Sequence, residues 1–338
     1  MKNRYALLTS TVLALALLSC TETQHSESVE NTQNFHLAQA TDLFAGSSVK
    51  VKQSLVDCTL SNGTKTSCIS ITTTPTEATH ELGPWCPRNI SDGADKSGIW
   101  LDGGKVHNAD GQFIANLAKF YKDSKWQLFN PETGAVNVTN SKEACLAAAR
   151  PDVDPKYQNH CVECLPSYVD SRKAVTYLIP VNPVPLTNSQ RVHPHGGIGL
   201  AFSGVKFDAP APVDAILGAY TLAPFDDCGG HINPHAGYHY HAVTGCATEK
   251  DSIENHAPMI GYALDGYKLY SQLNKDSKEP DDLDACRGHE FSSLGYHYHV
   301  NDPGKNQILG CFRAEQGCAL EDSSQTCEVT DRRPPPPA

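Results

Sequence analysis

The sequence contains little methionine and no basic segment. Met1 and Met259 are its only methionines, which argues against a carrier that holds Cu(I) through thioether sulfur. Lysine and arginine together number 27 against 38 acidic residues, and the formal net charge is −11. The longest basic patch is Arg332-Arg333. This balance argues against nucleic acid as a partner and against electrostatic docking on an anionic membrane.

The apolar segment near the start of the chain, residues 6–19, is too short to span a bilayer comfortably. Two basic residues precede it and "LLSC" ends it, so we expect a signal peptide over residues 1–20. The ending resembles the lipobox of bacterial lipoproteins, in which the cysteine, here Cys20, is lipidated. An ordinary signal peptide is the alternative. The lipoprotein interpretation predicts an extracytoplasmic protein with a lipid anchor. The residue after Cys20 is Thr21 and not aspartate, which resembles the sorting pattern of outer-membrane lipoproteins. The chain would then lie on the periplasmic face of that membrane or at the cell surface.

The chain has thirteen cysteines, and removing Cys20 leaves twelve. An even number in an oxidising compartment allows six disulfides. Cys58 and Cys68 flank an Asn62-Gly63 turn signal, which predicts a hairpin that brings the two cysteines together. A second expected pair, Cys318–Cys327, would close a loop near the C-terminus.

The segment "HCVEC" gives Cys161 and Cys164 a spacing that would suggest zinc or redox chemistry in the cytosol. In an exported chain, disulfide partners are the favoured interpretation. Their pairing with each other, with Cys86 or with Cys145 is left open.

The local patterns favour an α+β, mostly β fold: a disulfide-stapled, β-rich domain with a few short helices. Apolar runs at 174–181, 197–207 and 259–270 predict strands, the last with a turn at Asp265-Gly266. Helices are expected at 110–121, capped by Asp110, and at 140–150, capped by Asn140. The expected divisions after the signal peptide are a flexible tether (21–45), a disulfide-containing β/α region (46–180), a histidine-rich domain (181–318), and a C-terminal loop with a proline-rich tail (319–338).

The pentapeptide "GYHYH" occurs at 237–241 and again at 295–299. A cysteine, three histidines and a tyrosine recur at an offset of 58 residues, which indicates an internal repeat. We expect repeats over 226–246 and 284–311 that are related by a pseudo-twofold axis. Each would be closed by its own disulfide, Cys228–Cys246 in the first and Cys286–Cys311 in the second.

In a strand, alternate side chains point to opposite faces, so the two histidines of each pentapeptide share one face and the tyrosines share the other. Two imidazoles spaced in this way can chelate a metal ion, while the tyrosine rings can enter the core. A third His-x-His unit lies upstream at His193 and His195. The candidate metal ligands are His193, His195, His231, His239, His241, His289, His297 and His299.

Imidazole ligands suit copper(II), zinc, iron or nickel, and we expect copper or zinc. Eight histidines exceed one tetrahedral site, so either two ions bind or some histidines lie outside the first coordination sphere. Each copy of the repeat would contribute half of a shared site. His256, Asp265 and Tyr240 are possible helpers, although a turn position before Gly266 is the better interpretation of Asp265.

At these residues the sequence resembles the YHYH-domain family of secreted and lipid-anchored proteins. The resemblance covers roughly residues 190–313 and rests on "HPHGGIGLAF", "CGGHINP", both "GYHYH" segments and "HAPMIGYALDGYKLY". It implies a domain with a functional histidine face but supplies no reaction. The histidines that it marks are His231, His239, His241, His256, His289, His297 and His299.

Three functions remain open from the sequence. The first is an extracytoplasmic metalloprotein that handles metal, by sequestering or delivering it, or does redox chemistry. The second is a metal-dependent enzyme acting on an extracellular substrate, although nothing like an HExxH motif is present. The third is a disulfide-rich surface module for binding or adhesion, which would leave the repeated His-x-His units unexplained.

Overall fold

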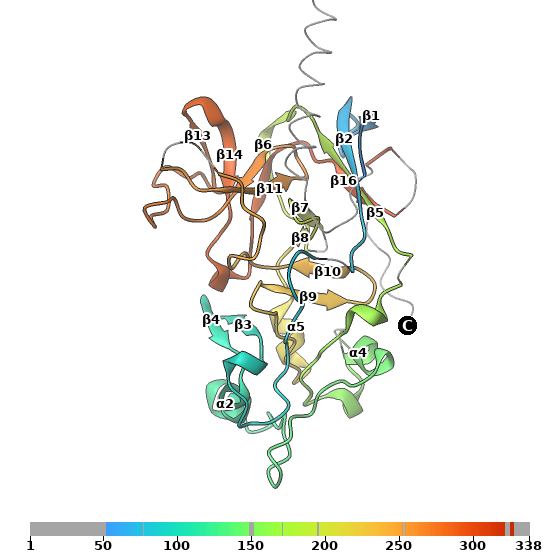
Figure 1. The fold of residues 1–338 in the computed structure, drawn as a ribbon, viewed down its shortest axis with the longest axis vertical. Coiled ribbons are helices and arrows are strands. Elements are labelled where there is room, and N and C mark those ends of the chain that lie inside the picture. Colours follow the sequence, from blue (N-terminus) through green and yellow to red (C-terminus); the bar gives the residue numbers. More distant parts are fainter. Residues whose placement is uncertain are drawn as a thin grey trace, which may run out of the picture.

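The computed structural model describes residues 52–327 apart from 77, 149–151, 171, 195, 252, 254 and 322–324. Its architecture is mostly β, with short helices at the edges, as the sequence predicts (Figure 1). The expected signal peptide with Cys20 and the tether over 21–45 lie outside the described residues, as does the end of the tail. Within the described ranges, no helix has the length and apolar character needed to cross a membrane.

The largest sheet has eight strands in the order β13-β14-β12-β11-β7-β8-β10-β9. Its strands are β7 (Gly197–Ala201), β8 (Lys206–Asp208), β9 (Gly230–Asn233), β10 (Gly237–Tyr240), β11 (Met259–Ala263), β12 (Lys268–Tyr270), β13 (Gly288–Phe291) and β14 (Gly295–His299). The single strand expected over 197–207 is wrong, because the chain turns at Gly204 (φ 80°) and forms the β7–β8 hairpin. The turn expected at Asp265-Gly266 is confirmed and joins β11 to β12.

The two halves of this sheet have the same succession of pairings. From the centre outwards, β7–β8 is antiparallel, β8–β10 parallel and β10–β9 antiparallel. On the other side, β11–β12 is antiparallel, β12–β14 parallel and β14–β13 antiparallel. The pseudo-twofold axis itself stays a prediction.

The halves meet where β7 and β11 pair antiparallel at the centre of the sheet. Gly199 lies opposite Ala263, and Gly261 lies opposite Ala201. A Cβ atom added to either glycine would come within 2.2 Å of a carbonyl oxygen of the facing strand. The close approach of the two backbones therefore requires glycine at both positions.

A second sheet combines distant segments in the order β1-β2-β5-β16. Its strands are β1 (Lys52–Thr59), β2 (Lys65–Thr73), β5 (Val175–Pro180) and β16 (Cys318–Leu320). Smaller two-stranded sheets are formed by β3 (Ile99–Asp102) with β4 (Lys105–Asn108), and by β6 (Pro185–Arg191) with β15 (Cys311–Ala314). The C-terminal segment thus shares a sheet with strands from the expected 46–180 region.

The helices are short and lie mainly in the lower part of Figure 1. They are α2 (Gly111–Ala115), α3 (Leu117–Phe120), α4 (Lys142–Ala148) and α5 (Val213–Gly218), with 3₁₀ turns at Ala94–Lys96, Pro155–Tyr157, Pro166–Tyr168, Ser292–Leu294 and Pro303–Lys305. Asp110 caps α2 as expected, since its carboxylate accepts a hydrogen bond from the Phe113 amide at 2.8 Å.

Two details of the helix prediction are wrong. The helix expected over 110–121 is interrupted at Asn116, whose side chain donates a hydrogen bond to the Gln112 carbonyl at 2.7 Å and competes with the helical pattern. At α4, Ser141 and not Asn140 acts as the cap, because its hydroxyl accepts from the Ala144 amide at 3.1 Å.

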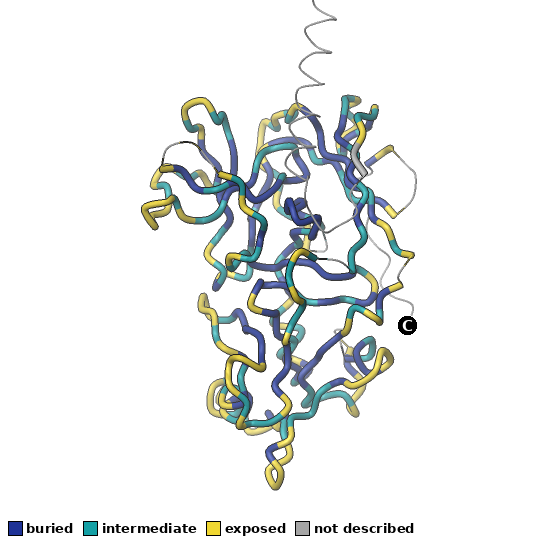
Figure 2. The backbone as a smooth tube through the Cα atoms, in the orientation of Figure 1, coloured by how far each residue is buried: buried dark blue, intermediate teal, exposed yellow. Residues whose placement is uncertain are grey.

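The main core lies around the large sheet, where much of the backbone is buried (Figure 2). It includes buried tyrosines from the pentapeptides. A second core cluster surrounds Trp100 in the lower part of the molecule and includes Phe225. Six disulfides close the fold. The four predicted pairs, Cys58–Cys68, Cys228–Cys246, Cys286–Cys311 and Cys318–Cys327, are all present. The pairs left open are Cys86–Cys161 and Cys145–Cys164.

Candidate metal centres

The pentapeptides form strands β10 and β14, and their side chains alternate as predicted. Tyr238, Tyr240 and Tyr298 are almost completely buried in the main core. Each strand pairs with its neighbour in the same register, so that His231 lies opposite His239 and His289 lies opposite His297. Residues directly opposite each other point to the same face. The strand pairing therefore gathers the histidines of each repeat on one face of the sheet.

The histidines form two separate groups that could each hold a metal ion, with ligand atoms within 4.8 Å of one another. We call the group formed by histidines of the first repeat centre 1, and the group formed by histidines of the second repeat together with His256 centre 2. Centre 1 consists of His231, His239 and His241. Centre 2 consists of His256, His289, His297 and His299.

Centre 2 is compact and buried. The Nε2 atom of His297 lies 3.1 Å from His289 Nε2 and 3.0 Å from His256 Nε2. Nitrogen atoms bound to one tetrahedral Zn²⁺ at 2.0–2.1 Å are about 3.3–3.4 Å apart. His299 is completely buried, and its Nε2 atom has no hydrogen-bond partner. The spacing and orientation of these four imidazoles suit a single bound cation.

Centre 1 has the same arrangement with one imidazole fewer. His231 and His241 approach each other with their Nε2 atoms 3.2 Å apart, and the ring of His239 lies 4.8 Å from both of theirs. His239 and His241 are buried, whereas His231 is half-buried. Phe225, from the second core cluster, packs against His231 and His241 at 5.1 and 5.3 Å.

Backbone carbonyls determine the tautomer of the pentapeptide histidines. Nδ1 of His239 donates to the Gly237 carbonyl at 2.9 Å, and Nδ1 of His297 donates to the Gly295 carbonyl at 2.8 Å. The following histidine of each strand does the same across the sheet: His241 to Ala209 at 2.5 Å, and His299 to Ser271 at 2.9 Å. Because a carbonyl only accepts, the proton is on Nδ1 and the lone pair is on Nε2, which faces the centre.

The two remaining imidazoles of centre 2 are oriented in a similar way. His256 Nδ1 donates to the Ala257 carbonyl at 3.1 Å, and His289 Nδ1 donates to the Asp282 carboxylate at 2.6 Å. A carboxylate that accepts a hydrogen bond from a metal-binding histidine holds the ring in place and raises its basicity as a ligand. Asp282 was not among the residues that sequence reasoning found, since no repeated spacing marks it.

Burial is the largest influence on the acidity of these imidazoles. It lowers the pKa of His231, His239, His241 and His299 to about 3, and that of His297 to about 4. These five histidines are therefore neutral at physiological pH, which is the form that binds a metal ion.

The two centres lie on opposite sides of the large sheet's central strands. Strands β12, β11, β7 and β8 separate β14 from β10. Five strand-to-strand intervals correspond to a distance on the order of 20 Å. The expectation that each repeat supplies half of a shared site is therefore wrong, because the histidines of the two repeats lie in two separate centres, with His256 added to centre 2 from the segment between the repeats. Of the eight candidate histidines, six lie in these two groups, which could each hold an ion.

The other candidate residues differ in whether they belong to a centre. His193 is exposed and belongs to neither centre, and His195 lies outside the described residues. His256, expected as a helper and marked by the family resemblance, is a member of centre 2. Tyr240 and Asp265 belong to neither centre. Asp265 is completely buried at its turn, where it accepts a 2.6 Å hydrogen bond from the Tyr298 hydroxyl.

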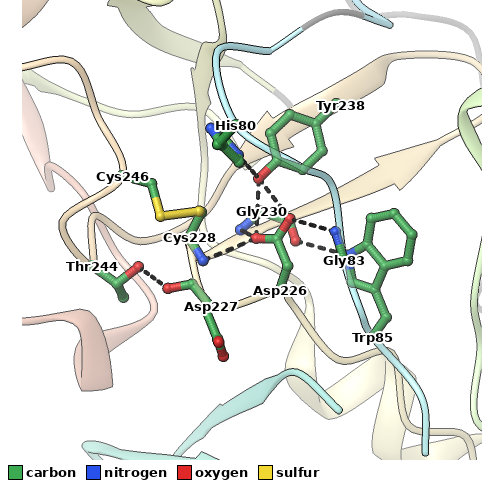
Figure 3. Close-up of a disulfide and its surroundings, with 10 residues drawn as sticks. All are labelled: His80, Gly83, Trp85, Asp226, Asp227, Cys228, Gly230, Tyr238, Thr244 and Cys246. Atoms are coloured by element: carbon green, nitrogen blue, oxygen red, sulfur yellow. Dashed lines mark hydrogen bonds between the residues drawn. A yellow bond between two sulfur atoms is a disulfide. The ribbon is translucent and has the colours of Figure 1, made fainter. Parts of the chain in front are cut away.

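Each repeat also begins with an aspartate that holds its turn in place, and Figure 3 shows the first of them. Asp226 Oδ1 accepts hydrogen bonds from the amides of Cys228 and Gly230, at 3.1 and 3.0 Å. Its Oδ2 accepts from the Tyr238 hydroxyl at 2.8 Å and from the Gly83 amide at 3.3 Å. The carboxylate thereby joins the turn to the tyrosine face of β10.

The second repeat uses Asp284 in the same way. Its Oδ1 accepts from the amides of Cys286 and Gly288, at 2.8 and 3.0 Å, and its Oδ2 accepts from the Tyr296 hydroxyl at 2.9 Å. Asp284 lies 58 residues after Asp226, so the repeat offset is a signal that could have identified both.

Comparison with known proteins supports the expected resemblance. Residues 176–282 match the family described as YHYH protein. This range contains all of centre 1 and His256, and it ends before the second pentapeptide. Searches of the curated proteins and of the solved structures found no match.

The burial of the histidines predicts that acid destabilises the metal-free protein. An unfolded imidazole takes up a proton near pH 6.5, whereas these folded ones do so near pH 3 to 4. Between these values the unfolded chain binds more protons, so the free energy of unfolding falls as the pH falls. Burial raises the pKa of Asp226 and Asp265 to about 6, so these two carboxyl groups make the free energy of unfolding rise as the pH falls. The five histidines outnumber them, so the free energy of unfolding still falls with pH.

We therefore expect the Tm of the chelator-treated protein to fall by several degrees between pH 7 and pH 5. Calorimetry with the disulfides intact measures this directly. A Tm that stays constant or rises over this range would show that the imidazoles are not held neutral by burial.

Proposed function

We propose that this protein binds transition-metal ions, one in each histidine centre, and handles them outside the cytoplasm from a lipid anchor in the outer membrane. Copper or zinc is the expected ion. The observation that carries the proposal is the convergence of buried Nε2 lone pairs whose Nδ1 protons are already donated elsewhere.

Without a cation, this arrangement is electrostatically unfavourable. In centre 2, His297 and His256, each with its proton on Nδ1, face each other with unshared electron pairs 3.0 Å apart. The His299 Nε2 atom adds a buried acceptor without a partner, which costs about 1–3 kcal/mol. A metal ion supplies the positive charge that all of these lone pairs can share.

The choice of metal follows from the donor atoms. Both centres offer imidazole, which suits Cu²⁺ and Zn²⁺. All twelve cysteines other than Cys20 are in disulfides, so thiolates do not compete for a soft ion. The six disulfides also support an oxidising compartment, in agreement with the proposed location.

The burial of centre 2 supports metal holding as its role. All four of its histidines are buried, and a catalytic centre needs a coordination position open to substrate. Centre 1 is different because His231 is half-buried. Because His231 is partly exposed, the second candidate function is a metal-dependent enzyme with its active site at centre 1.

The proposal is tested by titrating the metal-stripped, untagged chain with Zn²⁺ and with Cu²⁺ in competition with a chromophoric chelator. Two equivalents should bind with affinity well above that of exposed imidazoles. The His235→Ala variant is the matched control, because His235 is exposed and lies in the same repeat as centre 1. If His235→Ala reduces the stoichiometry as much as His239→Ala does, metal binding is a property of the surface and the proposal fails.

A further inference from the structure

The chain contains a second internal repeat, in the segments that form the strands next to the two centres. Residues 197–208 and 259–270 match at an offset of 62. The identical pairs are Ile198/Ile260, Gly199/Gly261, Ala201/Ala263, Gly204/Gly266 and Lys206/Lys268. These segments form the hairpins β7–β8 and β11–β12. Each hairpin therefore places its second strand against one histidine strand, β8 against β10 and β12 against β14.

The matched strands differ at their last residue. β8 ends in Asp208, and β12 ends in Tyr270. Tyr270 pairs with His299, and its ring packs against His297 and His256 at 4.6 and 4.8 Å. The corresponding place beside centre 1 is occupied by a carboxylate.

Asp208 lies on the histidine face of the sheet. Lys206 pairs with His239, and Asp208 is two residues further along the same strand, so its side chain points to the same face. Its Oδ2 atom is 3.9 Å from His239 Nε2 and accepts a hydrogen bond from Lys206 Nζ at 2.8 Å. Only 14% of the side chain is exposed.

The surroundings keep this carboxylate charged. Lys206 Nζ pairs with the Oδ2 atom of Asp208 at 2.8 Å, and this ion pair favours the charged form of the carboxylate. An anionic oxygen 3.9 Å from the inward-facing Nε2 atom of His239 is a suitable ligand for a divalent cation.

Centre 1 also lacks the fourth imidazole that completes centre 2. His256 enters centre 2 from the segment just before β11. At the 62-residue offset, the matching position before β7 is Pro194, which has no donor atom in its side chain. The two centres must therefore complete their ligand sets from different elements.

We propose that Asp208 is the fourth ligand of centre 1, so that centre 1 binds its ion with three imidazoles and one carboxylate, whereas centre 2 uses four imidazoles. This inference rests on the proposed function. Lys206 acts as the positioning residue that orients the carboxylate. The two ions therefore differ in their environment, because only the ion in centre 1 has an anionic ligand.

The test uses the full chain in a His297→Ala background, in which centre 1 remains intact. Asp208→Asn in this background should weaken Zn²⁺ binding at least about 10-fold in a chelator competition. X-ray absorption of the zinc-loaded parent should show three imidazoles and one oxygen ligand. In a His239→Ala background, which retains centre 2, Asp208→Asn should leave the affinity unchanged.

Lys206→Met distinguishes a ligand from a structural ion pair. If Asp208 binds the metal, Lys206→Met should weaken zinc binding much less than Asp208→Asn does. Equal losses in the two variants would overturn this inference but not the proposed function. The same holds if Asp208→Asn has no effect while the wild-type chain binds two ions. A wild-type chain that binds no zinc would overturn the proposed function and the inference with it.

Discussion

The His297→Ala variant is expected to bind one transition-metal ion per chain where the wild-type chain binds two. His297 lies at the middle of centre 2, where its Nε2 atom contacts both His289 and His256. Removing this imidazole leaves three ligands around a cavity and should weaken binding at centre 2 by at least about 100-fold. Centre 1 should be unaffected, because four strands separate the two centres.

His239→Ala is the matched variant for centre 1, and it should remove the other ion. The double variant should bind none. Equilibrium dialysis followed by elemental analysis gives the stoichiometry of each variant, and far-UV circular dichroism at 20 °C confirms that each one is folded. If either single substitution removes both ions, the two repeats build one shared site and the two-centre arrangement is incorrect.

Removal of metal from the wild-type protein should lower its Tm by at least about 10 °C at pH 7.5. An ion present at 1,000 times its dissociation constant stabilises the folded state by about 4 kcal/mol per site. A change of 1 kcal/mol shifts the Tm of a domain of this size by about 2–4 °C. The metal-free state additionally leaves the buried lone pairs of His297 and His256 facing each other in centre 2.

Differential scanning calorimetry before and after chelator treatment measures this shift. Restoration of the Tm by Zn²⁺ but not by Mg²⁺ would connect it to imidazole ligation, since Mg²⁺ prefers oxygen ligands. The double variant His239→Ala/His297→Ala is the control and should not respond to the chelator. A wild-type Tm that is the same with and without chelator would contradict the metal-binding account.

The faces of the pentapeptide strands could be predicted from the sequence because alternation in a strand is a local property. The hairpin at Asn62-Gly63 and the turn at Asp265-Gly266 could likewise be predicted from adjacent residues. The repeat spacing also predicted the disulfides Cys228–Cys246 and Cys286–Cys311. Each of these features depends on residues that are close together in the chain.

The features that were missed depend on the order of strands in the sheet. The separation of the two centres follows from the central pairing of β7 with β11, which no local pattern specifies. Asp208 and Asp282 approach the histidines only through that arrangement. The Cys86–Cys161 disulfide spans 75 residues, and its cysteines carry no repeat that could match them. The 62-residue offset was visible in the sequence and would have placed β8 and β12 in equivalent positions.

The most direct test of the account is the metal content of the untagged protein, purified without chelators from cells that export it. We predict two transition-metal ions per chain, retained through dialysis against a weak chelator. Metal well below one ion per chain, bound no more tightly than by exposed histidines, would contradict it.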